Sequence, residues 1–286
     1  MPAPGQELLG WTQTRLQAVQ NALEKALLNT AKCRQVIPKG PDLIGHRVVV
    51  IPNIGGAPPI AYGPDIAATP VQIYVDFTLD DLHAETEEDI IRIISTTAAQ
   101  VGTLEDVEIV QGGVGPVFGP GTGRVPRNVG LARLAAQAPP GGPPAVLIGA
   151  GGIMPNGAQL FTAIVNAVAA LEIAGRAGQF ALLLHNSLMA ILRQPRVPGG
   201  VPLITEVQGL VGSNKIASTS ALDGTFAPPQ IGAILFRLEP PAMDIVRTQL
   251  PRVTLVARAA FTNNLCIEED IALRILEPAA VQPIAY

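Results

Sequence analysis

The chain has 286 residues, which is enough to bury a substantial core in one large domain or two intertwined domains. Hydrophobic residues make up 48% and charged residues only 15%, which is too little charged surface for a soluble monomer and favours extensive burial between subunits. The net charge of -4 argues against a general affinity for nucleic acid, and the most apolar stretches are too short to span a membrane.

The two cysteines, Cys33 and Cys266, lie in unrelated contexts and have no zinc-site spacing, which favours a reducing compartment. The first residues, MPAPGQELLGW, lack the basic and apolar regions of a secretion signal. We therefore expect a cytoplasmic protein with no membrane partner.

The first part of the chain predicts a helix, a strand and an arm. Apolar residues recur at helical spacing within Leu9–Asn29, and a β-branched run predicts a strand over His46–Pro52. Asn53–Pro70 is rich in proline and glycine, which exclude a helix, yet it is too apolar for a disordered linker. We expect an extended arm that packs outside its own domain through Ile54, Ile60, Tyr62 and Ile66.

A strand followed by a long helix is predicted next. Apolar residues alternate over Val71–Phe77, and Thr78 with Asp81 fits a capping box at the start of a helix that ends at Glu105-Asp106. The buried stripe of this helix is expected to comprise Ile90, Ile94, Ala98 and Val101.

The second half mixes helices and strands without regular βαβ alternation, so the fold class is α+β. Helices are expected over Arg127–Gln137, Ala158–Ala177 (buried on most sides) and Asn186–Arg193. Strands are expected over Ala145–Ile148, Phe180–Leu184, Gly232–Leu238, Val253–Phe261 and Ile271–Leu276.

No catalytic constellation stands out. Gly149-Ala150-Gly151-Gly152 starts like a dinucleotide fingerprint, but Met154 replaces the small residue that helix–strand contact needs. The loop Gly115–Arg124 lacks the Gly-Lys-Ser/Thr ending of a phosphate loop, and His185-Asn186-Ser187 lacks a nucleophile elbow. We expect no catalytic residue, metal or cofactor. A dinucleotide-dependent enzyme remains the alternative from another class.

In order and spacing, several segments resemble the encapsulin shell proteins (linocin-like family), which share the Hong Kong 97-type fold of tailed-phage capsid proteins. The resemblance is carried by Trp11, Cys33-Arg34, Val36, Gly40-Pro41, Asn53–Pro70, Ile73–Phe77 with Leu79, Glu105-Asp106, Gly112, Gln179–Leu192, Ala221-Leu222-Asp223-Gly224 and Glu269–Val281. An Arg-Gly-Gly-Asp-Phe segment of the family is absent, so the chain is identified as a divergent member.

The resemblance implies an N-terminal helix and arm (1–41), an extended-loop region (42–77), and a peripheral domain with a spine helix (78–144). It further implies a mainly axial domain (145–226) and C-terminal strands that return to the peripheral domain (227–286).

The implied function is a non-enzymatic, self-assembling icosahedral nanocompartment that encloses a cargo enzyme, such as a peroxidase or a ferritin-like protein. The cargo's terminal peptide would bind a groove lined by Leu16, Leu23, Leu27, Val36, Ile37 and Ile245. No nucleic-acid partner is expected. The alternative within the same fold is the major capsid protein of a tailed phage or prophage.

Overall fold

The computed structural model describes residues 11–46, 49–51, 66–68, 70–80, 86–112, 122–124, 131, 145–148, 154–195, 199–222, 231–258 and 262–285. Within them, helices and strands are mixed, as an α+β chain requires. Two sheets and a separate two-stranded ribbon organise the strands.

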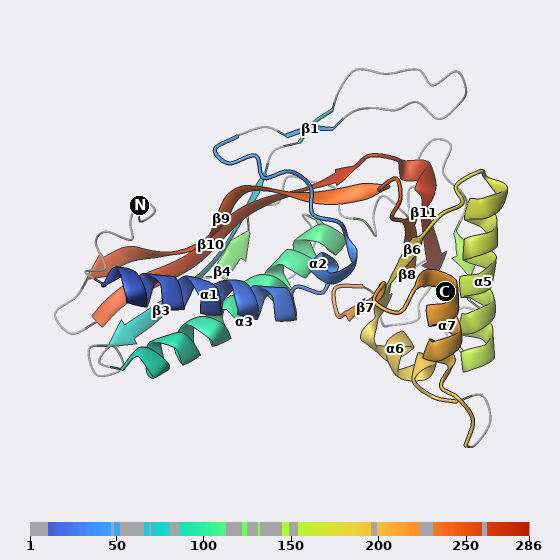
Figure 1. The fold of residues 1–286 in the computed structure, drawn as a ribbon, viewed down its shortest axis with the longest axis horizontal. Coiled ribbons are helices and arrows are strands. Elements are labelled where there is room, and N and C mark those ends of the chain that lie inside the picture. The colour runs from blue at the N-terminus through green and yellow to red at the C-terminus, as the bar shows by residue number, and fades with distance from the viewer. Residues whose placement is uncertain are drawn as a thin grey trace.

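A four-stranded antiparallel sheet has the order β4-β3-β10-β9. It comprises β3 (Val71–Asp80), β4 (Thr122–Arg124), β9 (Met243–Arg258) and β10 (Thr262–Ile275). Helices α1 (Gln13–Thr30) and α3 (Glu87–Gln111) contact each other and lie along this sheet, whose strands β9 and β10 run along the length of the molecule (Figure 1). The short helix α2 (Cys33–Val36) follows α1.

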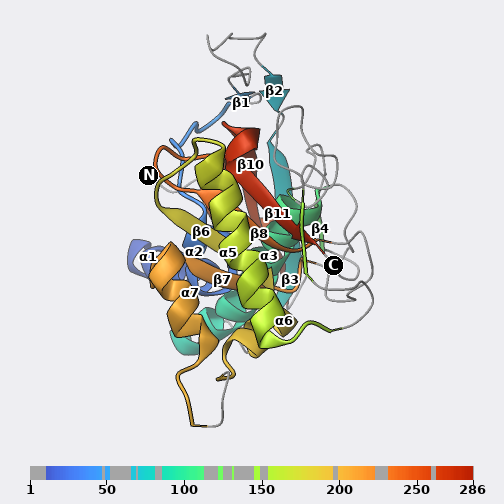
Figure 2. The same cartoon turned by 90° about the vertical axis from the view of Figure 1, so that its right-hand side faces the viewer.

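A five-stranded mixed sheet has the order β5-β11-β8-β6-β7. It comprises β5 (Val146–Leu147), β6 (Phe180–His185), β7 (Ile216–Thr219), β8 (Ile231–Arg237) and β11 (Val281–Ala285), the last preceded by the 3-10 turn η2 (Pro278–Ala280). Helices α5 (Gly157–Ile173), α6 (Asn186–Leu192) and α7 (Leu203–Val211) cover one of its faces, as Figure 2 shows.

The five-stranded sheet is buried on both faces, which explains the continuous apolar runs of β6 and β8. Leu182 and Leu184 pack with α5, α6 and α7, whereas Ala181 and Leu183 belong to the core of the four-stranded sheet, α1 and α3. Alternating side chains of one strand therefore join the two parts of the molecule.

The helical stripe predicted for the long helix is confirmed, because Ile90, Ile94, Ala98 and Val101 are fully buried. Its predicted start is wrong. Thr78 lies within β3, which stays paired with β10 as far as Asp80 opposite Thr262. The helix starts after Thr86, whose hydroxyl accepts a hydrogen bond from the Asp89 amide at 3.3 Å.

The predicted end of this helix at Glu105-Asp106 is also wrong. The helix continues to Gln111 and is capped by Gly112, whose φ of 62° lies in the left-handed region that favours glycine. Both acidic residues are buried inside the helix rather than exposed at its end, because partners from distant segments surround them.

Helix α5 departs from the expectation that it is buried on most sides. Only one stripe is buried, and Ile173 at its end is 88% exposed. The strands predicted near the C-terminus are longer than expected, and β10 starts at Thr262. The helix predicted over Arg127–Gln137 lies outside the described residues apart from Leu131.

The C-terminal strands divide between the two sheets. β9 and β10 lie in the four-stranded sheet, but β8 and β11 pair with β6 and β5 in the other one. The two-stranded ribbon of β1 (Val49–Ile51) and β2 (Ile66–Ala68) is hydrogen-bonded to neither sheet, although β1 contacts β10.

Candidate functional site

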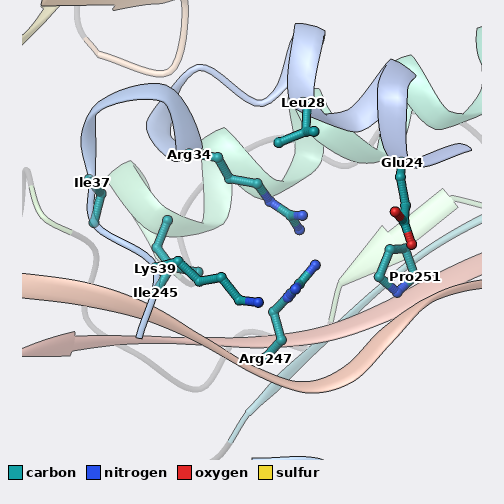
Figure 3. Close-up of a pocket in the computed structure, with 8 residues that line it drawn as sticks. All are labelled: Glu24, Leu28, Arg34, Ile37, Lys39, Ile245, Arg247 and Pro251. Atoms are coloured by element: carbon teal, nitrogen blue, oxygen red, sulfur yellow. The ribbon is translucent and has the colours of Figure 1, made fainter. Parts of the chain in front are cut away.

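A cavity of about 250 Å³ lies between α1, the segment that follows α2, and strand β9 (Figure 3). Four of its lining side chains are apolar and the others are three cations and one carboxylate. The cationic ends of Arg34, Lys39 and Arg247 gather in the middle of the view, while the Glu24 carboxylate lies beside Pro251. The lining residues are Glu24, Leu28, Arg34, Ile37, Lys39, Ile245, Arg247 and Pro251.

Helix α1 supplies the upper wall because of its amphipathic pattern. Its buried stripe, which includes Leu23 and Leu27, packs against α3, and both side chains are fully buried. The neighbouring residue Leu28 points away from that stripe and is 59% exposed at the cavity.

The segment after α2 runs beside the edge of β9 and supplies the opposite wall. The Ile245 amide donates to the Pro38 carbonyl at 3.0 Å, and the Gly40 amide donates back to the Ile245 carbonyl at 2.8 Å. Farther along, the Leu43 amide donates to the Arg247 carbonyl at 2.9 Å. These bonds place Ile37 and Lys39 next to Ile245 and Arg247, although about two hundred residues separate them in sequence.

Gly40 allows this close approach. A Cβ at this position would lie 2.7 Å from Asp244 Oδ2 and 2.9 Å from Val246 Cγ2. A larger residue would therefore push the segment away from β9 and open the cavity wall.

Arg34 connects the cavity to a buried carboxylate cluster. Its Nε lies 2.6 Å from Glu105 Oε1, and its Nη2 forms an ion pair with Glu269 Oε2. Both carboxylate side chains are fully buried, whereas Arg34 keeps 11% of its side chain exposed. One oxygen of each carboxylate, Glu105 Oε2 and Glu269 Oε1, has no hydrogen-bond partner among the described residues.

Burial raises the pKa of Glu105 to about 8, even though Arg34 acts to lower it, and the charge of Glu269 adds to the increase. Burial alone would lower the pKa of Arg34, but the two carboxylates together raise it. Two buried carboxyl groups thus share one guanidinium, and burial makes Glu105 hold a proton more readily than an exposed glutamate.

Asp106 fixes the junction between α1 and α2. Its carboxylate accepts hydrogen bonds from the amides of Lys32 at 3.1 Å and Cys33 at 2.9 Å. Burial raises the pKa of Asp106 in spite of these bonds, and burial also raises the pKa of the Cys33 thiol well above its usual value. Cys33 is therefore an inert core residue.

Lys39 and Arg247 share one carboxylate at the cavity wall. Lys39 Nζ lies 2.7 Å from Asp42 Oδ2, and Arg247 Nε lies 3.2 Å from Asp42 Oδ1. The hydrogen bond with Lys39 and the nearby Arg247 lower the pKa of Asp42. One negative charge therefore faces two positive ones.

Of the six residues predicted for the groove, Ile37 and Ile245 line the cavity. Leu23, Leu27 and Val36 are instead buried in the core of the subunit, and Leu16 packs against that core while partly buried. The predicted arm residues Ile54, Ile60 and Tyr62 lie outside the described residues, and Ile66 begins β2.

The residues that sequence reasoning missed are mostly polar. Arg34 had one sequence signal, its place in the Cys33-Arg34 pair. Lys39 and Arg247 had none, because the strand pairing that brings them together joins the two ends of the chain.

Other candidate sites carry no chemistry in the described structure. The glycine motif at residues 149–152 lies outside the described residues. The short strand β5 that precedes it is described. His185 is the N-cap of α6, and its Nδ1 lies 2.7 Å from Ser187 Oγ. Among the described residues no group of His, Cys, Asp and Glu could hold a metal ion. No described helix is long and apolar enough to cross a membrane.

Comparisons with known proteins agree on the fold. The Linocin_M18 family, described as "Encapsulating protein for peroxidase", matches residues 150–228. The virus-like particle protein from Pyrococcus furiosus superposes with a TM-score of 0.67 at 13% identity, covering 96% of this chain and 100% of the other. The chain therefore has the Hong Kong 97-type fold of capsid and encapsulin shell proteins, and residues 150–228 are similar to the encapsulin family.

Two further structures show the same capsid fold. The capsid of an empty GTA particle gives a TM-score of 0.61 at 15% identity, and the capsid of Myoviridae phage XM1 gives 0.56 at 10% identity. Each match covers 90% of this chain and 90% of the other chain. No curated protein matches the sequence significantly.

Proposed function

We propose that the chain is a non-enzymatic shell subunit that assembles into a closed icosahedral particle around a cargo protein. The similarity to the Pyrococcus furiosus virus-like particle over 96% of this chain is the observation that carries the proposal. The family match over residues 150–228 supports it.

The surface supports self-association. Leu147 in β5, Met154 before α5 and Ile173 at the end of α5 are 66%, 54% and 88% exposed. Exposed large apolar side chains on a chain with 15% charged residues favour contacts with further copies. A shell repeats such heterologous contacts until it closes.

The ribbon of β1 and β2 is the proposed base of an arm that overlaps a neighbouring subunit. It forms a separate two-stranded sheet next to β10. Deleting Asn53–Pro70 should abolish closed particles while leaving the subunit folded, measured by light scattering and circular dichroism. Closed particles from the deletion variant would refute the role of the arm.

The cavity beside α1 is the proposed binding site for a terminal peptide of the cargo. Ile37 and Ile245 form its apolar floor, and Leu28 offers an exposed apolar rim. An extended peptide can insert one apolar side chain there. A peroxidase is the first cargo to test, in view of the family description.

The second candidate function is a phage or prophage capsid protein that packages DNA. The similarity to the phage XM1 capsid favours it. The two functions differ in content, so purified particles should be treated with nuclease and then analysed for protected nucleic acid and protein. Protected DNA without a co-purifying protein would support the capsid function and contradict the cargo function.

Size-exclusion chromatography with light scattering tests assembly itself. The full chain expressed alone should elute as one large species of uniform mass. A monomer or a small oligomer at both low and high salt would contradict the proposed function.

A further inference from the structure

We infer that the cavity beside α1 selects peptides in which an acidic side chain lies next to a large apolar one. This inference rests on the proposed function, because it specifies the chemistry of the peptide that the shell subunit would take. It depends on the charges and the apolar floor of one cavity.

Three of the four charged side chains that line the cavity are cations. Arg34, Lys39 and Arg247 line it together with a single carboxylate, that of Glu24. In Figure 3 the Glu24 carboxylate lies beside Pro251, away from the place where the three cationic ends gather.

The ion-pair partners among the described residues do not neutralise the exposed cations Lys39 and Arg247. Among the described residues, Asp42 is the carboxylate that pairs with both Lys39 and Arg247, so the three groups together carry one net positive charge. Lys39 is 57% exposed and Arg247 is 18% exposed, which leaves both available to a ligand. A carboxylate between them would gain charge-assisted hydrogen bonds and relieve the repulsion of two like charges.

Arg34, whose charge is compensated by Glu105 and Glu269, offers a hydrogen-bond donor in a fixed position. Its bonds to the buried Glu105 and Glu269 hold the guanidinium at the cavity wall, and 11% of the side chain remains exposed. A ligand therefore meets a rigid donor there rather than a mobile side chain, which reduces the entropy lost on binding.

The apolar half favours a peptide over a nucleic acid. Leu28, Ile37, Ile245 and Pro251 line half of the cavity and match one aliphatic side chain. A phosphodiester backbone would use the cations but leave this apolar surface unpaired, and the net charge of -4 opposes a polyanion.

The test is a competition between terminal tags during assembly. A fluorescent protein ends in a hexapeptide in which four positions sample every arrangement of Leu, Glu, Lys and Ser. The pool is co-expressed with the affinity-tagged full chain, and the tags that co-purify are quantified by mass spectrometry. Because capture is through the affinity tag, the result can be read whether or not particles form.

Tags with Glu next to Leu should be enriched about tenfold over the same tags with Lys in place of Glu. Lys39→Glu should remove or invert this preference. Asp42→Asn should strengthen it, because the variant frees both cations from their shared carboxylate. Arg258→Glu, an exposed charge reversal on the same strand outside the cavity, should leave the preference unchanged.

Equal recovery of Glu and Lys tags, or no enrichment of any tag, would overturn the inference. So would nuclease-protected nucleic acid that is lost in Lys39→Glu while no tag is selected. Particles that form normally without any tag preference would refute this inference alone, whereas the absence of particles would refute the proposed function.

Discussion

The buried carboxyl group of Glu105 should make the stability of the subunit depend on pH. Its pKa rises from an ordinary 4.5 to about 8 in the folded chain, chiefly through burial. The folded state therefore keeps a proton that the unfolded state releases in this interval. The stabilisation is fully present below about pH 4.5, and it is lost as the pH rises through about 8.

The size of this effect follows from the difference between the pKa of Glu105 in the folded chain, about 8, and its ordinary value of 4.5, which is about 3.5 pH units. At about 1.4 kcal/mol for each pH unit, the free energy of unfolding should fall on the order of 5 kcal/mol across the interval. Glu105→Gln should remove most of this loss, because the amide has the shape of the protonated carboxyl group and does not ionise.

Guanidinium denaturation followed by the fluorescence of Trp11 measures the effect, since Trp11 is the single tryptophan and packs against the core. We expect Glu105→Gln to be similar to the natural chain near pH 5 and more stable by several kcal/mol near pH 9. Burial also raises the pKa values of Asp106 and Asp270. Both residues are present in the natural chain and in Glu105→Gln, so their effects on stability cancel in the comparison.

Glu88→Gln, an exposed change on the first turn of α3, is the matched control and should leave the pH profile unchanged. Parallel profiles for Glu105→Gln and the natural chain would refute the reasoning. They would mean that Arg34 keeps Glu105 ionised in the folded subunit at every pH tested.

Four other substitutions test the packing of α1 and α3 and the cap of α3 by the midpoint of urea denaturation. Leu27→Asp places a charge in the core and should destabilise the chain by at least about 3–5 kcal/mol, whereas Leu28→Asp next to it should change stability by about 0.5 kcal/mol or less. Gly102→Ala brings a Cβ within 2.4 Å of Thr30 Oγ1 and should cost about 1–3 kcal/mol; an unchanged midpoint would mean that the helices separate freely. Thr86→Ala removes the N-cap of α3 and should cost about 1 kcal/mol, while no loss would place the helix start elsewhere.

Local periodicity was sufficient to predict most elements. The stripe Ile90, Ile94, Ala98 and Val101 identified the long helix, and the apolar runs in β6 and β8 identified two buried strands. Both patterns depend only on residues that are neighbours in sequence, so they can be recognised without knowledge of the fold.

The limits of the long helix could not be read locally. Thr78 and Thr86 are each followed three residues later by an aspartate, so both fit a cap, and pairing with β10 decides that Thr78 stays in the strand. Glu105-Asp106 suggested the end of the helix, but Arg34, which lies 71 residues before Glu105, allows Glu105 to be buried within the helix. Tertiary contacts decide both positions.

The candidate site was predicted only in part for the same reason. Ile37 and Ile245 followed from the resemblance to encapsulins, whereas the cations beside them depend on the pairing of the segment after α2 with β9. Leu23 and Leu27 shared a helical stripe with Leu16, and a stripe alone does not say whether it faces the core or a partner.

Electron microscopy of the full chain, expressed alone and purified, tests assembly most directly. Uniform closed particles with icosahedral symmetry are expected, with the β1–β2 ribbon of one subunit lying over its neighbour. Monomers or small open oligomers over a range of salt concentrations would contradict a shell-forming function, even though the fold would stand.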